Sequence, residues 1–198
     1  MKEKTIVGIV IVFLSLLAIV FFFGSRGIGA PEIPSHIQVT SVPVKQSGAK
    51  DTTYSIDGQP VTLSGGVSEQ QVAPDSATKI KTSVFGELTL GDVNGDGQND
   101  AALILTQDGG GSGTFYYLAV AYSSSTGIVG TNALLLGDRV APQTLEIKNG
   151  MVIANYATRK PDEPMSTAPS VGVSLYAAMR GGVLTDITKE MRSKKVVE

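Results

Sequence analysis

Oxygen-bearing side chains stand at every second position in a short stretch near the middle of the chain. They belong to Asp92, Asn94, Asp96, Gln98 and Asp100, and a glycine follows Asp96. A hard cation such as calcium takes oxygen ligands, and a loop wraps around it where a glycine permits a sharp turn. The first three residues would offer side-chain oxygens, Gln98 its backbone carbonyl, and Asp100 a carboxylate, directly or through water. The spacing therefore predicts a calcium-binding loop.

The same residues allow two alternative interpretations. An EF-hand carries a bidentate glutamate at loop position twelve, but Leu103 stands there and a strand-like segment follows it. The second alternative is an Asx-rich turn without an ion. Three carboxylates in so short a loop repel one another, and asparagine with glycine makes a bare turn equally well. The acidic side chains therefore favour a bound cation.

Residues 91–102 resemble the calcium loops of FG-GAP repeats and related β-propeller repeats, in which the pattern D-x-[DN]-x-D-G-x-x-D connects two strands. Upstream, Phe85-Gly86 is similar to the Phe-Gly pair that names the repeat. The resemblance implies that calcium is surrounded by the same five residues. A propeller needs at least about four blades, so the chain is too short to form one.

A wider stretch, from about residue 52 to 187, resembles an uncharacterised bacterial exported domain that is membrane-anchored or lipid-anchored. This resemblance implies an exported all-β domain and brings no activity with it. The segments that carry it are GDVNGDGQND, GGGSGTFYY, LLLGDRVAPQ, NYATRKPDEPM and PSVGVS.

Two loops are candidate recognition surfaces, because rigid scaffolds often display functional residues on loops. They are the glycine-rich loop 108–113 and the polar loop 158–170, which contains two prolines in its first half. Nothing in their spacing selects a ligand, so solvated connections are the alternative. The candidate recognition residues are Ser112 in the first loop and Arg159, Lys160, Asp162 and Glu163 in the second.

Residues suited to catalysis are scarce. The chain has no cysteine, and its single histidine, His36, has no aspartate or second histidine nearby. A cysteine nucleophile and a thiolate zinc site are therefore excluded, and a Ser-His-Asp triad would have to use His36. We favour a non-enzymatic binding or structural protein. An envelope-acting enzyme or enzyme inhibitor that uses loops 108–113 and 158–170 is the alternative.

The elements that position these residues are predicted to be strands, because hydrophobic residues alternate with period two from position 51 onward. Asn149-Gly150 stands between two of the strands and is the signal of a type I′ hairpin turn. A helix over residues 68–78 is also considered. The pattern predicts an all-β fold, either a single antiparallel β-sandwich or a barrel-like meander. The predicted strands are 79–84, 100–106, 114–122, 145–147, 151–153, 170–176 and 183–187.

An apolar run near the amino end begins at Thr5, ends at Phe23 and contains no charged side chain. At about 1.5 Å per residue, a helix of this length spans roughly 28 Å, close to the thickness of the hydrocarbon core. Lys2 and Lys4 before the run and Arg26 after it favour a cytoplasmic amino terminus and an extracytoplasmic body. A cleaved signal peptide is the alternative, although its apolar region is shorter, at about 7 to 15 residues. We therefore expect an uncleaved transmembrane anchor in the cell membrane.

Four parts are predicted along the chain: a cytoplasmic tip and anchor at 1–23, a proline-containing linker at 24–50, an exported β domain at 51–191 and a polar tail at 192–198. The chain carries 16 Lys and Arg against 18 Asp and Glu, a net charge of −2. A nucleic-acid binder normally shows a basic face, so no nucleic acid is expected as a partner. The expected partners are the lipid bilayer, through residues 5–23, and a cell-wall glycan or an envelope protein.

Overall fold

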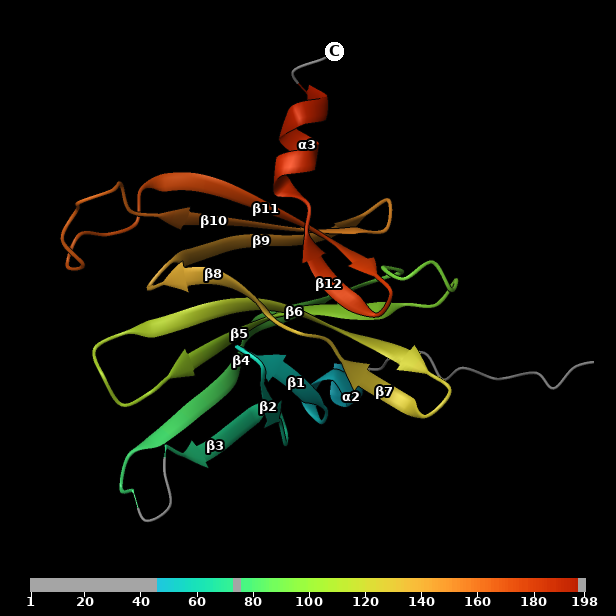
Figure 1. Ribbon diagram of the computed structural model, residues 1–198, viewed down its shortest axis with the longest axis horizontal. Coiled ribbons are helices and arrows are strands. Elements are labelled where there is room, and N and C mark those ends of the chain that lie inside the picture. Colours follow the sequence, from blue (N-terminus) through green and yellow to red (C-terminus); the bar gives the residue numbers. More distant parts are fainter. Residues whose placement is uncertain (1–45, 73–75, 196–198) are drawn as a thin grey trace, which may run out of the picture. The chain divides into compact units, whose positions relative to one another are not determined.

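A computed structural model of the protein describes residues 46–72 and 76–195 (Figure 1). The predicted anchor at 5–23 and most of the predicted linker lie outside these residues. Within the two described ranges, no helix is long and apolar enough to cross a membrane. The anchor and its orientation therefore stay predictions.

Strands dominate the described part of the chain, as the period-two pattern predicts. The helices are α2 (Gln46–Lys50) and α3 (Thr188–Lys195). The strands are β1 (Thr53–Ile56), β2 (Gln59–Thr62), β3 (Val67–Gln71), β4 (Lys79–Gly91), β5 (Asp100–Asp108), β6 (Thr114–Ser124), β7 (Gly127–Gly130), β8 (Leu134–Asp138), β9 (Ala141–Lys148), β10 (Met151–Thr158), β11 (Val171–Arg180) and β12 (Val183–Asp186).

Neighbouring strands pair antiparallel and form three sheets. A six-stranded sheet has the order β3-β4-β5-β6-β7, with β8 also paired to β6, and a four-stranded sheet has the order β12-β11-β10-β9. Strands β1 and β2 form a separate hairpin. No sheet of the described residues closes on itself, so the barrel-like alternative is wrong. The reason is that the chain leaves the first sheet after β8 and starts a second sheet at β9, instead of pairing a last strand with the first.

Two hydrophobic cores lie on opposite faces of the six-stranded sheet. On one face, Leu103 and Leu105 pack against α2 and the β1–β2 hairpin. On the other face, Ile104 and Leu118 pack against the four-stranded sheet. Because β5 is buried on both faces, its sequence is a continuous apolar run rather than an alternating one. Figure 1 shows the resulting three layers, with the six-stranded sheet in the middle.

Residues with positive φ connect paired strands at tight turns. Asn149 and Gly150, between β9 and β10, have φ angles of 52° and 71°. The predicted type I′ hairpin turn is therefore confirmed. Asp57 and Gly58, with φ angles of 50° and 79°, make a similar turn between β1 and β2 that the hydrophobic pattern did not predict.

Three segments differ from the sequence-based expectation. The predicted linker at 24–50 contains α2, whose Ala49 is fully buried in the first core. The predicted polar tail begins inside α3, at residue 192. The segment 68–78 begins as part of β3 and not as a helix, because pairing with β4 outweighs its weak helical pattern.

Candidate functional site

The predicted calcium loop connects β4 to β5, two neighbouring strands of the six-stranded sheet. Gly91 and Asp100 pair at its base. Gly91 lies so close to β9 that a Cβ atom there would be 2.9 Å from the Ile147 side chain. Val93 is buried in the core between the two large sheets. A ligand held by this loop would therefore act on the packing of both sheets.

Side-chain oxygens hold the backbone of the loop in a tight coil. Asp92 accepts hydrogen bonds from the N–H groups of Gly95 (2.7 Å) and Gly97 (2.9 Å), whose φ angles of 82° and 80° suit glycine. The bonds from Gly97 and Gly95 hold the pKa of the Asp92 carboxyl below its usual value. Asn94 Oδ1 accepts a hydrogen bond from the Asp96 N–H at 2.9 Å. The loop therefore curls around its own acidic side chains.

Asp96 continues the same arrangement. Its Oδ1 accepts a hydrogen bond from the Gln98 N–H at 2.8 Å, and its Oδ2 accepts one from the Asn94 side-chain amide at 3.1 Å. Asp96 itself is exposed. The structure thus brings the predicted ligand residues into one compact loop.

Asp100 is fully buried at the base of the loop, with 0% of its surface exposed. Its Oδ2 accepts hydrogen bonds from the N–H groups of Val93 (2.9 Å) and Asn94 (3.2 Å). Its Oδ1 is buried and has no hydrogen-bond partner among the described residues. Burial raises the pKa of Asp100, and the charges of Asp96 and Asp92 raise it as well, against the two N–H groups that lower it.

The donor set fits a hard cation. A buried carboxylate oxygen without a partner costs free energy unless a proton or a cation satisfies it. Carboxylate, amide and carbonyl oxygens are the ligands that calcium takes. However, no three acidic, histidine or cysteine side chains in the described ranges are arranged to hold a metal by themselves. Asn94 and backbone oxygens would therefore have to complete the coordination.

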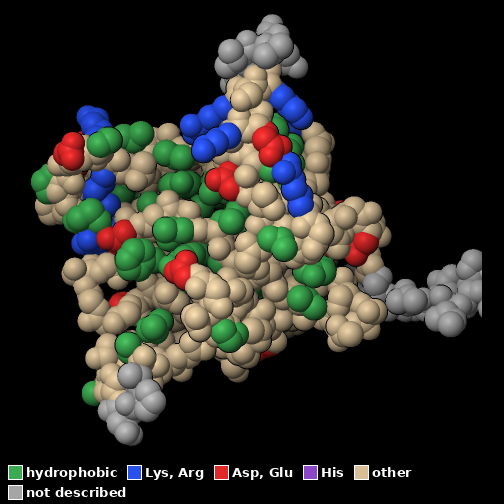
Figure 2. Space-filling model, in the orientation of Figure 1, with side chains coloured by type: hydrophobic (Ala, Val, Ile, Leu, Met, Phe, Trp, Pro, Cys, Tyr) green, Lys and Arg blue, Asp and Glu red, His purple; other side chains and the backbone are tan. Residues whose placement is uncertain are grey.

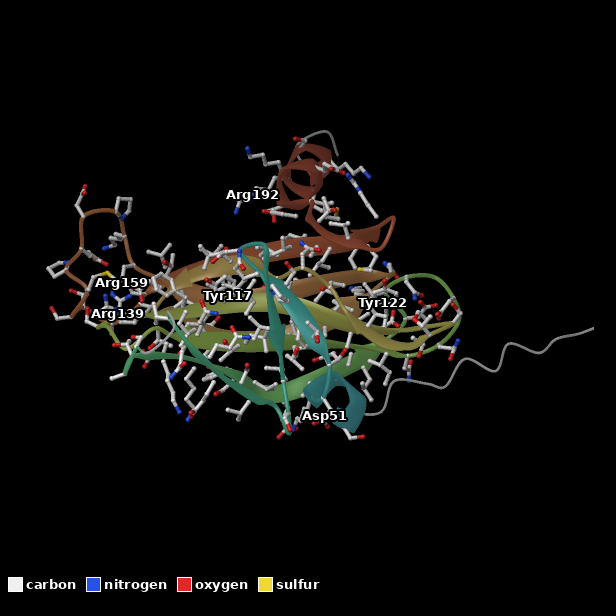
Figure 3. The ribbon with its side chains drawn as sticks, turned by 60° about the horizontal axis from the view of Figure 1, so that its bottom comes forward. Asp51, Tyr117, Tyr122, Arg139, Arg159 and Arg192 are labelled. Atoms are coloured by element: carbon white, nitrogen blue, oxygen red, sulfur yellow. The ribbon has the colours of Figure 1, made fainter. Side chains whose placement is uncertain are left out.

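The two predicted recognition loops meet at the turn between β8 and β9. The Asp138 carboxylate accepts a hydrogen bond from the Thr114 N–H (3.0 Å), and the Arg139 N–H donates to the Thr114 carbonyl (2.7 Å). Arg159 Nη1 donates to the Arg139 carbonyl at 2.9 Å. Figure 3 shows Arg139 and Arg159 next to each other at one end of the sheets. Both loops are therefore held to this turn.

The predicted recognition residues play different parts in these loops. The Lys160 N–H donates to the Glu163 carboxylate at 2.9 Å, and Lys160 Nζ lies 3.8 Å from the same group. Asp162 has a φ angle of 67° and is exposed, as is Ser112. Arg159 acts as a clamp on the backbone, so the side chains left accessible to a partner are those of Ser112, Lys160 and Asp162.

A groove that the sequence pattern did not predict lies between α3 and the outer face of the four-stranded sheet. Its volume is about 700 Å³. The one sign of it in the sequence is the basic run RSKK at 192–195. The residues that line it include Gly172, Ser174, Tyr176, Met191, Arg192 and Lys194.

The fold and the loop define an all-β protein of open antiparallel sheets with an acidic loop between two central strands. Comparisons of the chain with models of protein families, with curated proteins and with solved structures gave no match.

Proposed function

We propose that this chain is a calcium-binding β module of the cell envelope that acts by binding and not by catalysis. Residues 5–23 would anchor it in the cell membrane, with the amino terminus in the cytoplasm and the β domain outside. One observation carries the calcium proposal: Asp100 Oδ1 is buried without a hydrogen-bond partner among the described residues. The acidic loop around this oxygen supplies the remaining ligands.

Calcium in this loop would have a structural role. Asp92, Asn94 and Asp96 would bind it through side-chain oxygens, Gln98 through its backbone carbonyl and Asp100 through its carboxylate. The ion would offset the repulsion among the three carboxylates. Magnesium suits the loop less well, because it demands near-ideal octahedral geometry and gives up water reluctantly. Because the loop joins β4 to β5, the ion would stabilise the middle of the six-stranded sheet.

The chemistry of the remaining residues supports binding over catalysis. The chain has no cysteine, and His36 lies outside the described residues. Among the described groups outside the loop, those with raised pKa values include Tyr54, Tyr117 and Tyr156, and burial is the first cause for each. All three belong to the hydrophobic cores. They are therefore poorly placed to meet a substrate.

An enzyme inhibitor or enzyme of the envelope that uses loops 108–113 and 158–170 is the second candidate. The hydrogen bonds of Asp138, Arg139 and Arg159 favour it, because preformed loops lose less conformational entropy on binding. If loop 108–113 is only a connection, Ser112→Ala should leave folding and partner binding unchanged. A large loss of binding without unfolding would support this second candidate.

Calcium binding can be tested on the full chain in a non-ionic detergent, by calorimetric titration and by thermal melting. Extracellular calcium modules bind with dissociation constants of about 10⁻⁴ to 10⁻³ M. A ligand held only by the native state at about a hundred times its dissociation constant adds about 2.7 kcal/mol of stability. We expect a higher melting temperature in millimolar calcium than in chelator, and a much smaller rise in magnesium.

Two variants make the calcium test specific to the loop. Asp96→Ala should abolish most of the calcium-dependent rise, because it removes an exposed ligand and leaves the core intact. Asp162→Asn is the matched control, since it removes an exposed carboxylate at a position where asparagine tolerates positive φ. This control should keep the full rise. Identical melting of the wild-type chain in calcium and chelator would contradict the proposal.

A further inference from the structure

The groove beside the C-terminal helix has a floor and a wall of different chemistry. The floor is the outer face of the four-stranded sheet, to which β11 contributes Ser174 and Tyr176. The wall is α3, which contributes Met191, Arg192 and Lys194. Figure 1 shows α3 projecting away from this sheet.

Contacts at the base of α3 hold this wall in place. The Asp186 carboxylate accepts a hydrogen bond at 2.8 Å from the Thr188 N–H, one of the N–H groups in the first turn that have no partner within the helix. Thr188 Oγ1 accepts a hydrogen bond from the Tyr176 N–H at 3.0 Å. Two residues further along the helix, Glu190 pairs with Arg180 of β11 at 2.7 Å. The groove is therefore formed before any ligand arrives.

A row of polar side chains crosses the outer face of the sheet and ends in the groove. Thr144 Oγ1 donates to the Glu146 carboxylate at 3.1 Å and accepts a hydrogen bond from Asn155 Nδ2 at 2.8 Å. Ser174 Oγ donates to Asn155 Oδ1 at 2.6 Å. We call these four residues the polar row. The oxygen atoms of these side chains can accept further hydrogen bonds from hydroxyl groups of a ligand.

The wall of the groove is cationic although the chain as a whole is acidic. Helix α3 (TKEMRSKK) contains four basic residues and one acidic residue, whereas the net charge of the chain is −2. The single acid, Glu190, is paired with Arg180. Arg192 and Lys194 are exposed and form no ion pair with any residue that the structure describes. Figure 2 shows Lys and Arg side chains gathered on and beside this helix.

We infer that this groove binds an anionic glycan, a sugar chain that carries carboxylate or phosphate groups. Hydroxyl groups of the sugar would exchange hydrogen bonds with the polar row, and a ring would lie against the half-buried Tyr176, whose aromatic body and polar tip suit such a contact. The negative groups would meet Arg192 and Lys194. This inference rests on the proposed role as a binding module, but it uses no residue of the calcium loop.

Three polymers test the inference on the full chain in a non-ionic detergent. Dextran and carboxymethyl-dextran share a sugar backbone and differ in charge, and polyphosphate carries charge without sugar. We expect saturable binding of carboxymethyl-dextran that weakens as salt is added, because salt screens exposed charges. Dextran and polyphosphate should each bind at least about tenfold more weakly, a difference of about 1.4 kcal/mol.

Single substitutions of exposed or half-buried residues test whether the polymer binds in the groove. Arg192→Glu should weaken binding of carboxymethyl-dextran by about tenfold or more, because it reverses a charge at the wall. Tyr176→Ala should weaken it as well and should keep the melting behaviour of a folded domain. Lys81→Glu makes the same kind of charge reversal at an exposed residue of β4, in the other sheet, and should leave binding unchanged.

Any of three results would overturn the inference: polyphosphate binding as tightly as carboxymethyl-dextran, Lys81→Glu costing as much as Arg192→Glu, or no binding of either dextran. A repeat of the titration in chelator, below the melting temperature, separates this inference from the calcium proposal. Binding that persists there supports the groove, whatever calcium does to the melting temperature. Shortening of the polymer during the titration would contradict the non-enzymatic role instead.

Discussion

Tyr117 extends its hydroxyl group from the first core to the Asp57 carboxylate, at a distance of 3.0 Å. Asp57 stands in the turn between β1 and β2, so this hydrogen bond ties the hairpin to β6 of the central sheet. Burial raises the pKa of Tyr117 to about 12, and the hydrogen bond and charge of Asp57 add to the effect. The folded state therefore favours the neutral hydroxyl group.

This hydroxyl group predicts how stability falls in alkali. A tyrosine whose pKa is higher in the folded state than in the unfolded state stabilises the fold. This stabilisation is complete below the usual tyrosine pKa of about 10 and is lost as pH rises towards the folded value. Between about pH 10 and 12, Tyr117 alone should lower the free energy of unfolding by at most about 1.4 kcal/mol per pH unit. Urea unfolding at a series of pH values measures this slope.

Tyr117→Phe should make the alkaline decline shallower and should cost about 1 kcal/mol at neutral pH, the net worth of a typical hydrogen bond. Some decline should remain, because burial also raises the pKa of Tyr54. An unchanged alkaline slope in Tyr117→Phe would show that this hydroxyl group does not titrate with unfolding.

At the scale of elements, β7 depends on a close approach to β1. A Cβ atom at Gly130 would meet the Thr53 carbonyl oxygen and would lie 2.7 Å from Cδ1 of the Tyr54 ring. Beyond β7, the Ser55 N–H donates to the Thr131 carbonyl at 3.1 Å. The hairpin can therefore cover the first core only because residue 130 has no side chain.

Gly130→Ala should destabilise the domain by about 1 to 3 kcal/mol, because the new methyl group forces β7 away from β1. Gly172→Ala in β11 is the matched control, since a Cβ atom there meets nothing within 4 Å. The control should be neutral or up to about 1 kcal/mol more stable. Urea midpoints compare the two variants, and equal midpoints would contradict the close approach.

A second element-scale contact joins the two large sheets. Asn132 follows β7, and its side-chain amide bonds the backbone of Leu184 in β12 twice. The amide nitrogen donates to the Leu184 carbonyl at 2.9 Å, and the Leu184 N–H donates to the amide oxygen at 2.8 Å. The side chain thus substitutes for one residue of a neighbouring strand at the edge of the four-stranded sheet.

For the molecule as a whole, the predicted anchor would determine which side of the membrane carries the β domain. Lys2 and Lys4 against Arg26 favour a cytoplasmic amino terminus. Protease added to intact cells should therefore digest the chain beyond about residue 24 and leave a protected amino-terminal fragment. Immunoblots against tags at both ends measure this. Complete protection of the body would reverse the orientation, and release into the medium with a new terminus near residue 31 would indicate cleavage.

Local chemistry in the sequence alone determines much of this protein. Alternating hydrophobic residues predict the strands, because side chains on a pleated strand point to opposite faces in turn. Asn149-Gly150 predicts its hairpin, because both residues tolerate positive φ. The spacing from Asp92 to Asp100 predicts a loop between two strands, which the structure confirms, and the calcium ion that this loop would hold stays a proposal.

Long-range packing decided the rest. The order of strands, the second sheet and the covering hairpin depend on contacts between segments far apart in the chain, which no local pattern contains. Burial of Asp100 depends on the same packing, and so does the use of Arg159 as a clamp on Arg139. The groove exists only because Ser174 and Tyr176 of β11 lie beside α3, a helix whose second half is predicted from the sequence to belong to a polar tail. A short and highly charged segment of that kind forms a stable wall only where a folded sheet supports its first turn.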